Sequence, residues 1–230
     1  MRFPTRSFVA ALGGALLVAV IGLTRESATQ EASGGQAPPG LDEELSGISG
    51  DPGKPRRHFR VRNPAQLEDD EASDIYAQVV DQMVAGYALS GDPSAVAYRS
   101  WRRYNRVPYV SATHGKRYIN HYANDVARDY GRYEQAGKLP VGAIIAKDSF
   151  SVAQDGTAHD GPLFLMEKMA EGFNETSGDW RYTMIMPDGS VFGATLGVNA
   201  DGVAFCIGCH LMRESYDHLY FPPPADRRDF

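Results

Sequence analysis

Gly142-Ala143-Ile144-Ile145-Ala146-Lys147-Asp148-Ser149-Phe150 is the stretch that decides the fold. Its length and its run of apolar residues predict a β-strand. Side chains alternate across a strand, so Lys147 shares a face with Ile145, and Asp148 shares the opposite face with Ala146. Whichever face is buried, an ionisable side chain points the same way as apolar neighbours. Taken alone, this pattern favours an edge strand whose lysine extends along the surface to water.

Further strands are predicted on both sides of this stretch. The candidates are Lys116–Tyr122 before it and Pro162–Met169, Trp180–Met186 and Ser190–Thr195 after it. Pro187-Asp188-Gly189 is a turn that joins the last two strands into a hairpin. Because helices come before most of these strands, the sequence predicts an α+β fold with a mostly antiparallel β-sheet packed with N-terminal helices.

Three helices are predicted from apolar spacing. The first begins near Ser73, carries an apolar stripe and ends at Ser90-Gly91-Asp92-Pro93. The second covers Ala95–Tyr104 and the third covers Asn124–Gln135. The side chains expected to face inward are Ile75, Val79, Met83 and Tyr87 in the first helix, Tyr98 and Trp101 in the second, and Val126, Tyr130 and Tyr133 in the third.

The N-terminal residues 1–30 have the features of a signal peptide or an N-terminal anchor. Arg2 and Arg6 precede Phe8–Leu23, sixteen residues without a charge. That run is short for a membrane span of ~20 residues and long for the ~7–15 apolar residues of a cleaved signal. We therefore expect export to the periplasm, with anchoring to the inner membrane left open.

Composition and charge set the remaining limits. Residues 31–70 are rich in Gly and Pro and predict a flexible linker, which leaves residues 71–230 for a single folded domain. Apolar residues make up 43% of the 230, which is ordinary for a globular protein. The net charge of −6 argues against nucleic acid as a partner.

Near the C-terminus, Cys206-Ile207-Gly208-Cys209-His210 matches Cys-x-x-Cys-His, the attachment pattern of haem c. The two thiols add across the vinyl groups of haem, and the histidine that follows can ligate the iron. Cys206 and Cys209 are the only cysteines in the chain. The alternatives are a thioredoxin-like redox pair, which belongs in a βαβ unit, half of a zinc site, which needs two more ligands, and a chance match. The sequence favours one covalently bound haem c with His210 on the iron, and this agrees with export, because bacteria attach haem c outside the cytoplasmic membrane.

Several motifs in a fixed order resemble the cytochrome P-460 family. They are Tyr98-Arg99-Ser100-Trp101, then Tyr118-x-Asn120 or Tyr122-x-Asn124, then Leu139–Asp148, Gly178-Asp179-Trp180 and the Cys206–His210 motif. The resemblance implies an antiparallel sheet packed with helices, one haem c per chain and a homodimer. Relatives in that family include hydroxylamine-oxidising enzymes and cytochrome c′-beta proteins that bind nitric oxide.

The resemblance also gives Lys147 a role. It matches the position of a strand lysine that is cross-linked to the porphyrin edge in the family's enzymes. A lysine in a desolvated pocket loses its charge readily and becomes nucleophilic, so the role is chemically reasonable. Nitric-oxide-binding relatives carry the matching strand too, so cross-linking stays open. The implied function is oxidation of hydroxylamine or a related small nitrogen compound at a five-coordinate haem, with a redox partner protein; a non-catalytic nitric-oxide binder or a simple electron-transfer cytochrome are the alternatives.

The residue on the open side of the iron is not fixed by the sequence. Oxidation needs a base there, whereas a gas binder caps the iron with apolar rings. The carboxylate candidates are Asp148, Asp160 and Glu167; the ring candidates are Phe150, Phe164, Phe173 and Phe205; and the sulfur ligand candidates are Met166, Met184 and Met186. His114, in the loop Ser111-Ala112-Thr113-His114-Gly115, is expected to have a hydrogen-bonded structural role.

Overall fold

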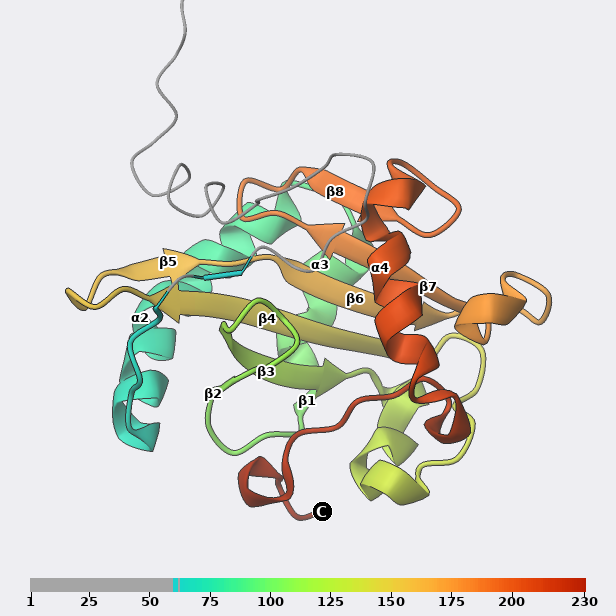
Figure 1. Cartoon of the computed structure of the whole chain (residues 1–230), viewed down its shortest axis with the longest axis horizontal. Helices are drawn as coiled ribbons and strands as arrows, with labels where there is room; N and C mark the ends of the chain where they lie inside the picture. The colour runs from blue at the N-terminus through green and yellow to red at the C-terminus, as the bar shows by residue number, and fades with distance from the viewer. Residues whose placement is uncertain (1–59, 62) are drawn as a thin grey trace, which may run out of the picture. The chain divides into compact units, whose positions relative to one another are not determined.

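The computed structural model describes residues 60–61 and 63–230, and an antiparallel sheet forms its centre (Figure 1). The strands run in the order β1-β3-β4-β6-β7-β8, with β2 paired to β3 and β5 paired to β4. The strands are β1 (Arg102–Arg103), β2 (Tyr109–Val110), β3 (Tyr118–Ala123), β4 (Ile144–Val152), β5 (Ala158–Asp160), β6 (Leu163–Lys168), β7 (Trp180–Ile185) and β8 (Val191–Ala194). Together with the helices, the sheet confirms the predicted α+β class.

Strand β4 lies in the interior of the sheet. It pairs along its length with β3 and, on the other side, with β5 and β6. Lys147 is opposite His121 on β3 and opposite Phe164 on β6. The edge-strand interpretation is therefore wrong, and both faces of β4 are buried. Lys147 is 3% exposed and Asp148 is fully buried.

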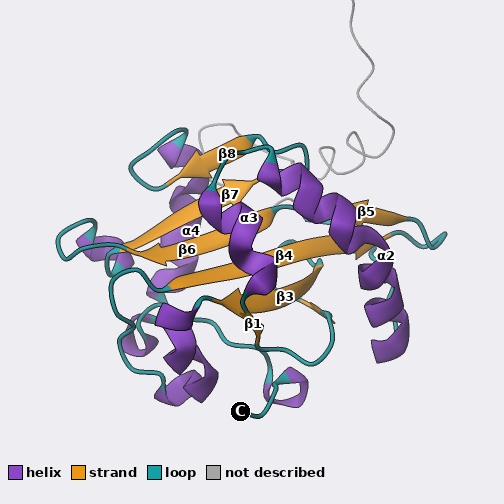
Figure 2. Ribbon diagram, turned by 180° about the vertical axis from the view of Figure 1, so that it is seen from behind, coloured by secondary structure: helices purple, strands orange, loops and turns teal. Residues whose placement is uncertain are grey.

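One face of the sheet, called here the helix face, is covered by α2 (Asp69–Ala88) and α3 (Pro93–Ala97), as Figure 2 shows. Helix α2 starts four residues before Ser73, because Glu68 and Glu71 form a capping box at its first turn. Its buried side chains are Ala72, Tyr76, Val80, Met83 and Tyr87, so Ile75 and Val79 are only partly buried. A constant step of four residues drifts around the helix, whereas mixed steps of three and four stay on one face.

The other two predicted helices are shorter or less regular than expected. Helix α3 ends at Ala97 and continues only as the 3₁₀ turn η1 (Tyr98–Ser100), because the chain becomes extended at Trp101 and enters the sheet as β1. The third is a 3₁₀ segment, η2 (Asp125–Gln135), interrupted at Ala127 and Tyr133. Within η2, Tyr130 is buried as expected, but Val126 is exposed.

Helix α4 (Ala200–Leu211) lies on the opposite face of the sheet, called here the motif face (Figure 1). The sequence patterns did not predict it, since Gly202 and Gly208 within it lower helix propensity. Short 3₁₀ turns complete the fold: η3 (Glu175–Ser177), η4 (Glu214–Tyr216) and η5 (Pro224–Asp226).

The predicted N-terminal segments fall mostly outside the described residues. This is true of the whole signal peptide or anchor at 1–30 and of most of the 31–70 linker. The described end of that linker contacts the sheet, since Ala65 N–H donates to the Val152 carbonyl (2.8 Å) and Leu67 N–H to the Tyr118 hydroxyl (2.7 Å). In residues 60–61 and 63–230, no helix combines the length and the apolar character that crossing a bilayer requires.

Candidate haem site

A cavity lies on the motif face, between α4 and strands β4, β6 and β7. Most of its wall is apolar, and its polar side chains come from three separate parts of the chain. The residues lining it are Ile145, Lys147, Phe164, Leu165, Met166, Tyr182 and Thr183 from the sheet, Cys206 and His210 from α4, and His114 from the loop between β2 and β3. The fold thus brings Lys147 together with Cys206 and His210, which lie about sixty residues away in the sequence.

Cys206 and His210 reach the cavity from the same side of α4, because residues four apart lie one above the other on a helix. Both side chains are buried, and Cys209 is half-buried. No disulfide joins Cys206 to Cys209. Burial raises the pKa of Cys206 to about 12, with the neighbouring Cys209 as a second cause, so the thiol is protonated at neutral pH.

The position of the motif bears on the alternatives for this cysteine pair. Cys206 is the seventh of the twelve residues of α4, whereas a thioredoxin-like pair sits where a strand meets a helix. Within the described part of the chain there is no group of three or more His, Cys, Asp and Glu side chains placed to hold a metal ion.

The imidazole of His210 has a fixed orientation. Its Nδ1 lies 2.7 Å from the carbonyl oxygen of His218. A carbonyl only accepts, so Nδ1 carries a proton, and in the neutral ring the lone pair is then on Nε2. The ring also packs against Tyr182 and Tyr220, at centroid distances of 4.9 and 5.1 Å. This is the tautomer and the kind of support that a metal-ligating histidine needs.

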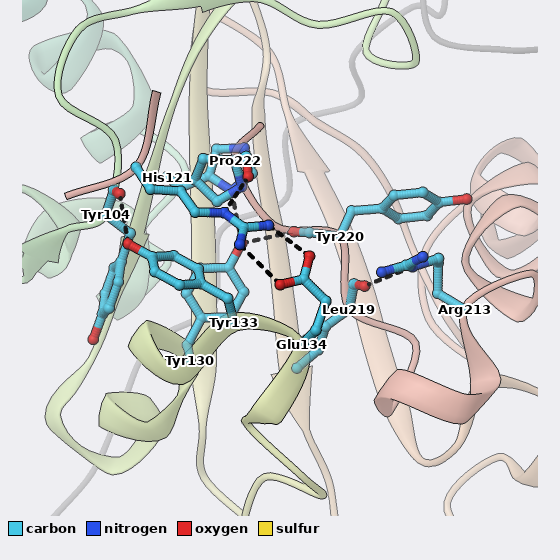
Figure 3. Close-up of polar contacts among 10 residues, drawn as sticks. Tyr104, His121, Tyr130, Tyr133, Glu134, Arg213, Leu219, Tyr220 and Pro222 are labelled. Atoms are coloured by element: carbon cyan, nitrogen blue, oxygen red, sulfur yellow. Dashed lines mark hydrogen bonds and ion pairs between the residues drawn. The ribbon is translucent and has the colours of Figure 1, made fainter. Parts of the chain in front are cut away.

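The carbonyl of His218 belongs to a segment, residues 217–222, that we call the C-terminal strap. Side chains hold its backbone carbonyls at nearly every residue, and Figure 3 shows three of these contacts. The donor and acceptor pairs are Trp180 to Asp217 (2.8 Å), His210 to His218 (2.7 Å), Arg213 to Leu219 (3.3 Å), Tyr130 to Tyr220 (2.7 Å) and Arg227 to Pro222 (2.8 Å). The orientation of His210 therefore depends on a strap that is itself anchored on both sides.

The strap is linked to the sheet through His121, the neighbour of Lys147 on β3 (Figure 3). Because the Tyr130 hydroxyl gives its proton to the Tyr220 carbonyl, it can only accept from His121 Nδ1 (2.7 Å). Nε2 of His121 then accepts from the Tyr109 hydroxyl (2.7 Å). Burial, and next the charge of Lys147, lower the pKa of His121 well below its ordinary value, so the ring is neutral.

Lys147 differs from the other buried lysine of the sheet. Lys168, 2% exposed, forms an ion pair with Asp217 (2.5 Å) and donates to the Gly178 carbonyl (2.9 Å). For Lys147, no hydrogen bond or ion pair is found with any residue that the structure describes. Burial lowers the pKa of Lys147 to about 7. An amine in this setting is substantially uncharged at neutral pH and nucleophilic.

The residues around the cavity fit a covalently held haem. The Tyr182 hydroxyl is buried without a hydrogen-bond partner in the described part of the chain, which is costly unless a bound group satisfies it. Together with the Lys147 amine it supplies polar groups, while Ile145, Phe164 and Met166 supply apolar walls. Two thiols on α4 and the His210 imidazole complete the set of groups that haem c requires.

None of the three carboxylate candidates lines the cavity. Asp148 is on the helix face, where Tyr76 and Asn120 donate to it. Glu167 is paired across the strands with Ile144, also on the helix face, and forms an ion pair with Arg181. Asp160 is on β5 and accepts from Gln82 of α2 (2.8 Å).

The ring and sulfur candidates are divided between the two faces. Phe164 and Met166 line the cavity. Phe150 is on the helix face and stacks on Tyr118 at 5.3 Å. Phe173, Phe205, Met184 and Met186 do not line the cavity.

His114 has the hydrogen bonds expected of it and also lies at the cavity. Its Nδ1 is 3.0 Å from the Ser111 hydroxyl and 3.2 Å from the Thr113 hydroxyl. The sequence offered no signal that this loop folds onto β6, nor that Tyr182 of β7 faces the same space. Both contacts depend on the tertiary packing rather than on a local pattern.

Comparison with protein families gives one match. A family model described as Cytochrome P460 matches residues 96–221, more than half of the 230 residues. The match runs from α3 to Phe221 in the C-terminal strap and includes every residue lining the cavity. No curated protein matches the chain.

Proposed function

The chain belongs to the cytochrome P460 family and is a c-type haem protein, and from this premise we propose that it oxidises hydroxylamine or a related small nitrogen compound at a five-coordinate haem. Cys206 and Cys209 hold the haem in this proposal, and His210 ligates the iron. The observation that carries the proposal is Lys147, a buried amine without a partner in the described residues, in the same cavity as His210. When bound there, haem supplies a redox-active iron with one position open to the substrate.

Lys147 is proposed to bond to the porphyrin edge. Nζ would be joined to a carbon at the porphyrin edge, with a C–N bond in place of one N–H and one C–H bond. This removes two electrons and two protons, which a peroxide accepts as it becomes two molecules of water. The depressed pKa of Lys147 supports the step, because only the uncharged amine has the lone pair that attacks.

The proposed bond can be tested by mass and optical spectra. Intact wild-type protein should have the mass of chain plus haem less two hydrogen atoms, and a shifted ferrous Soret band. The Lys147→Met variant should retain haem, regain the two hydrogens and lose the shift. Lys138→Met, at an exposed lysine, is the matched control and should behave as wild type. A full additive mass in the wild type, with a spectrum that Lys147→Met leaves unchanged, would contradict the bond.

Haem attachment itself has a separate test. Replacing Cys206 and Cys209 together with alanine should abolish covalent haem, because no other cysteine exists in the chain. Haem staining of the denatured protein measures this. Haem that survives denaturation in the double variant would show that the motif is not the attachment site.

Nitric oxide binding is the second candidate function. It is favoured by the absence of a carboxylate from the cavity lining, among the residues that the structure describes, and by the apolar side chains of Phe164 and Met166 there. Inertness toward hydroxylamine combined with tight nitric oxide binding would support it. A six-coordinate, low-spin spectrum without added ligand would instead point to an electron-transfer cytochrome with both axial positions filled.

The proposal includes a cellular setting. We expect an exported, periplasmic protein, either cleaved after residues 1–30 or anchored by them, that passes electrons to a redox partner protein. A homodimer is expected from the family resemblance. Fractionation of cells and the N-terminal sequence of the mature protein test the first point, and light scattering of the purified protein tests the second.

A further inference from the structure

His114 lies in the loop that joins β2 to β3, and this loop folds over the motif face of the sheet. Its side chain is 4% exposed, and its ring packs on Phe164 with a centroid distance of 5.1 Å. Lys147 is the β4 residue directly opposite Phe164. His114 therefore sits beside the amine that the proposed function places at the porphyrin edge.

The strand register places His114 and His210 over different rows of side chains. His210 packs on Tyr182, which is opposite Met166 in the row that begins with Ile145. His114 packs on Phe164, two residues from Met166 along β6 and on the same face. Two residues of strand span about 7 Å. The two imidazoles thus meet the cavity on adjacent rows of the sheet.

The hydrogen bonds of His114 indicate which nitrogen meets the cavity. The Ser111 hydroxyl accepts from the His114 backbone N–H (3.2 Å) and lies 3.0 Å from the ring Nδ1, and the Thr113 hydroxyl is also close to Nδ1. With two hydroxyls at Nδ1 we assign it as the acceptor, which puts the ring proton on Nε2. The proton that the His114 ring could donate is then the one on Nε2.

We propose that His114 is the distal residue: it lies on the face of the haem opposite His210 and donates a hydrogen bond from Nε2 to a small molecule held at the iron. This inference rests on the proposed function, since it requires a haem with an open position. It gives the site a polar, proton-bearing group where none of the carboxylate candidates is present. Two other polar lining residues have separate places in this arrangement: Lys147 at the porphyrin edge, and Tyr182 packed against His210.

The experiment uses the haem-loaded protein with carbon monoxide as the probe. A hydrogen bond to the bound probe lowers its C–O stretching frequency and slows its dissociation. In His114→Phe the stretch should shift to higher frequency and dissociation should be about fivefold faster, the factor expected for one neutral hydrogen bond. His114→Gln, which retains an N–H donor, should give intermediate values. His159→Phe, on β5 and outside the cavity, is the matched control and should match wild type.

The outcomes separate this inference from the proposed function. A five-coordinate haem whose C–O stretch and dissociation rate are the same in wild type, His114→Phe and His114→Gln overturns the distal role alone. A six-coordinate wild type that becomes five-coordinate in His114→Phe makes His114 an iron ligand, which overturns both. Should His114→Phe fail to fold, His114→Gln against wild type decides the question, because its shift has a stated direction.

Discussion

The two faces of strand β4 bury two ionisable side chains in opposite ways. On the helix face, Asp148 is fully buried and accepts hydrogen bonds from the hydroxyls of Tyr76 (2.5 Å) and Tyr98 (3.2 Å) and from the Asn120 amide (3.0 Å). On the motif face, Lys147 is buried beside a cavity and has no such partner in the described residues. The two residues are adjacent in sequence, so the difference comes from what each face is packed against.

This difference separates a structural buried charge from a functional one. A buried carboxylate with several donors stabilises the fold and fixes the packing of α2 on the sheet, because removing it would leave those donors without partners. A buried amine without a partner costs stability, so its retention calls for another explanation. In the proposed function, reactivity toward a bound haem is that explanation for Lys147.

The largest effect on the free energy of unfolding is expected from removing the Asp148 hydrogen bonds on the helix face. Asp148→Ala leaves three buried donors unsatisfied and should lower the free energy of unfolding by about 3–5 kcal/mol. Urea denaturation measures this. Asp74→Ala, at an exposed carboxylate on α2, should change it by less than about 0.5 kcal/mol. A similar, small loss in both variants would mean that the Asp148 network does not hold the helix face together.

Replacing Lys147 on the motif face should have the opposite effect on the free energy of unfolding, and that effect should depend on pH. The pKa of Lys147 is about 7 when folded and about 10.4 in an unfolded chain, so between these values the unfolded state binds the extra proton. Stability should therefore rise with pH across this window, by at most about 1.4 kcal/mol per pH unit. Lys147→Met should remove that rise and should not destabilise the protein at pH 7.

The pH dependence of stability with and without Lys147 is best compared in haem-free protein, in the Cys206→Ala, Cys209→Ala background. No cross-link can then remove the titrating amine. Urea denaturation at pH 7, 8 and 9 gives one profile for the chain that retains Lys147 and one for the Lys147→Met variant. The difference between the two profiles cancels the titration of all other groups. Parallel profiles would show that Lys147 is not held uncharged in the folded state.

Local patterns in the sequence were sufficient for the strands. Alternation and the Pro187-Asp188-Gly189 turn placed β3, β4, β6, β7 and β8 close to their observed bounds, because strand side chains repeat every two residues whatever the strand packs against. Helix α4 was missed, since the glycines at 202 and 208 obscure its propensity.

Only part of the candidate haem site could be predicted from the sequence, because the other part is formed by tertiary packing. The Cys206–His210 motif is contiguous, so its chemistry is visible in the sequence itself. The environment of Lys147 is not local, because whether β4 is an edge or an inner strand depends on pairings with β3 and β6. His114 and Tyr182 reach the cavity from other elements, and no spacing rule relates them to the motif.

The smallest effect on the free energy of unfolding is expected at the C-terminal strap, which Tyr130 connects to His121 of the sheet. Tyr130 is fully buried; it donates to the Tyr220 carbonyl and accepts from His121, the neighbour of Lys147. Tyr130→Phe removes both bonds and leaves a buried donor and a buried acceptor without a partner. It should lower the free energy of unfolding by about 1–3 kcal/mol, measured in urea.

Tyr133→Phe is the matched control for this change, because the Tyr133 hydroxyl also donates to a backbone carbonyl, that of Arg228, but near the surface. Its loss should be no more than about 1 kcal/mol, since water can replace the bond. If the strap orients His210 as well as stabilising the fold, Tyr130→Phe should also broaden the ferric haem spectrum, and Tyr133→Phe should not. Equal losses and unchanged spectra in both variants would show that Tyr130 is an ordinary core residue. The His210–His218 bond would then be the main support of the His210 imidazole.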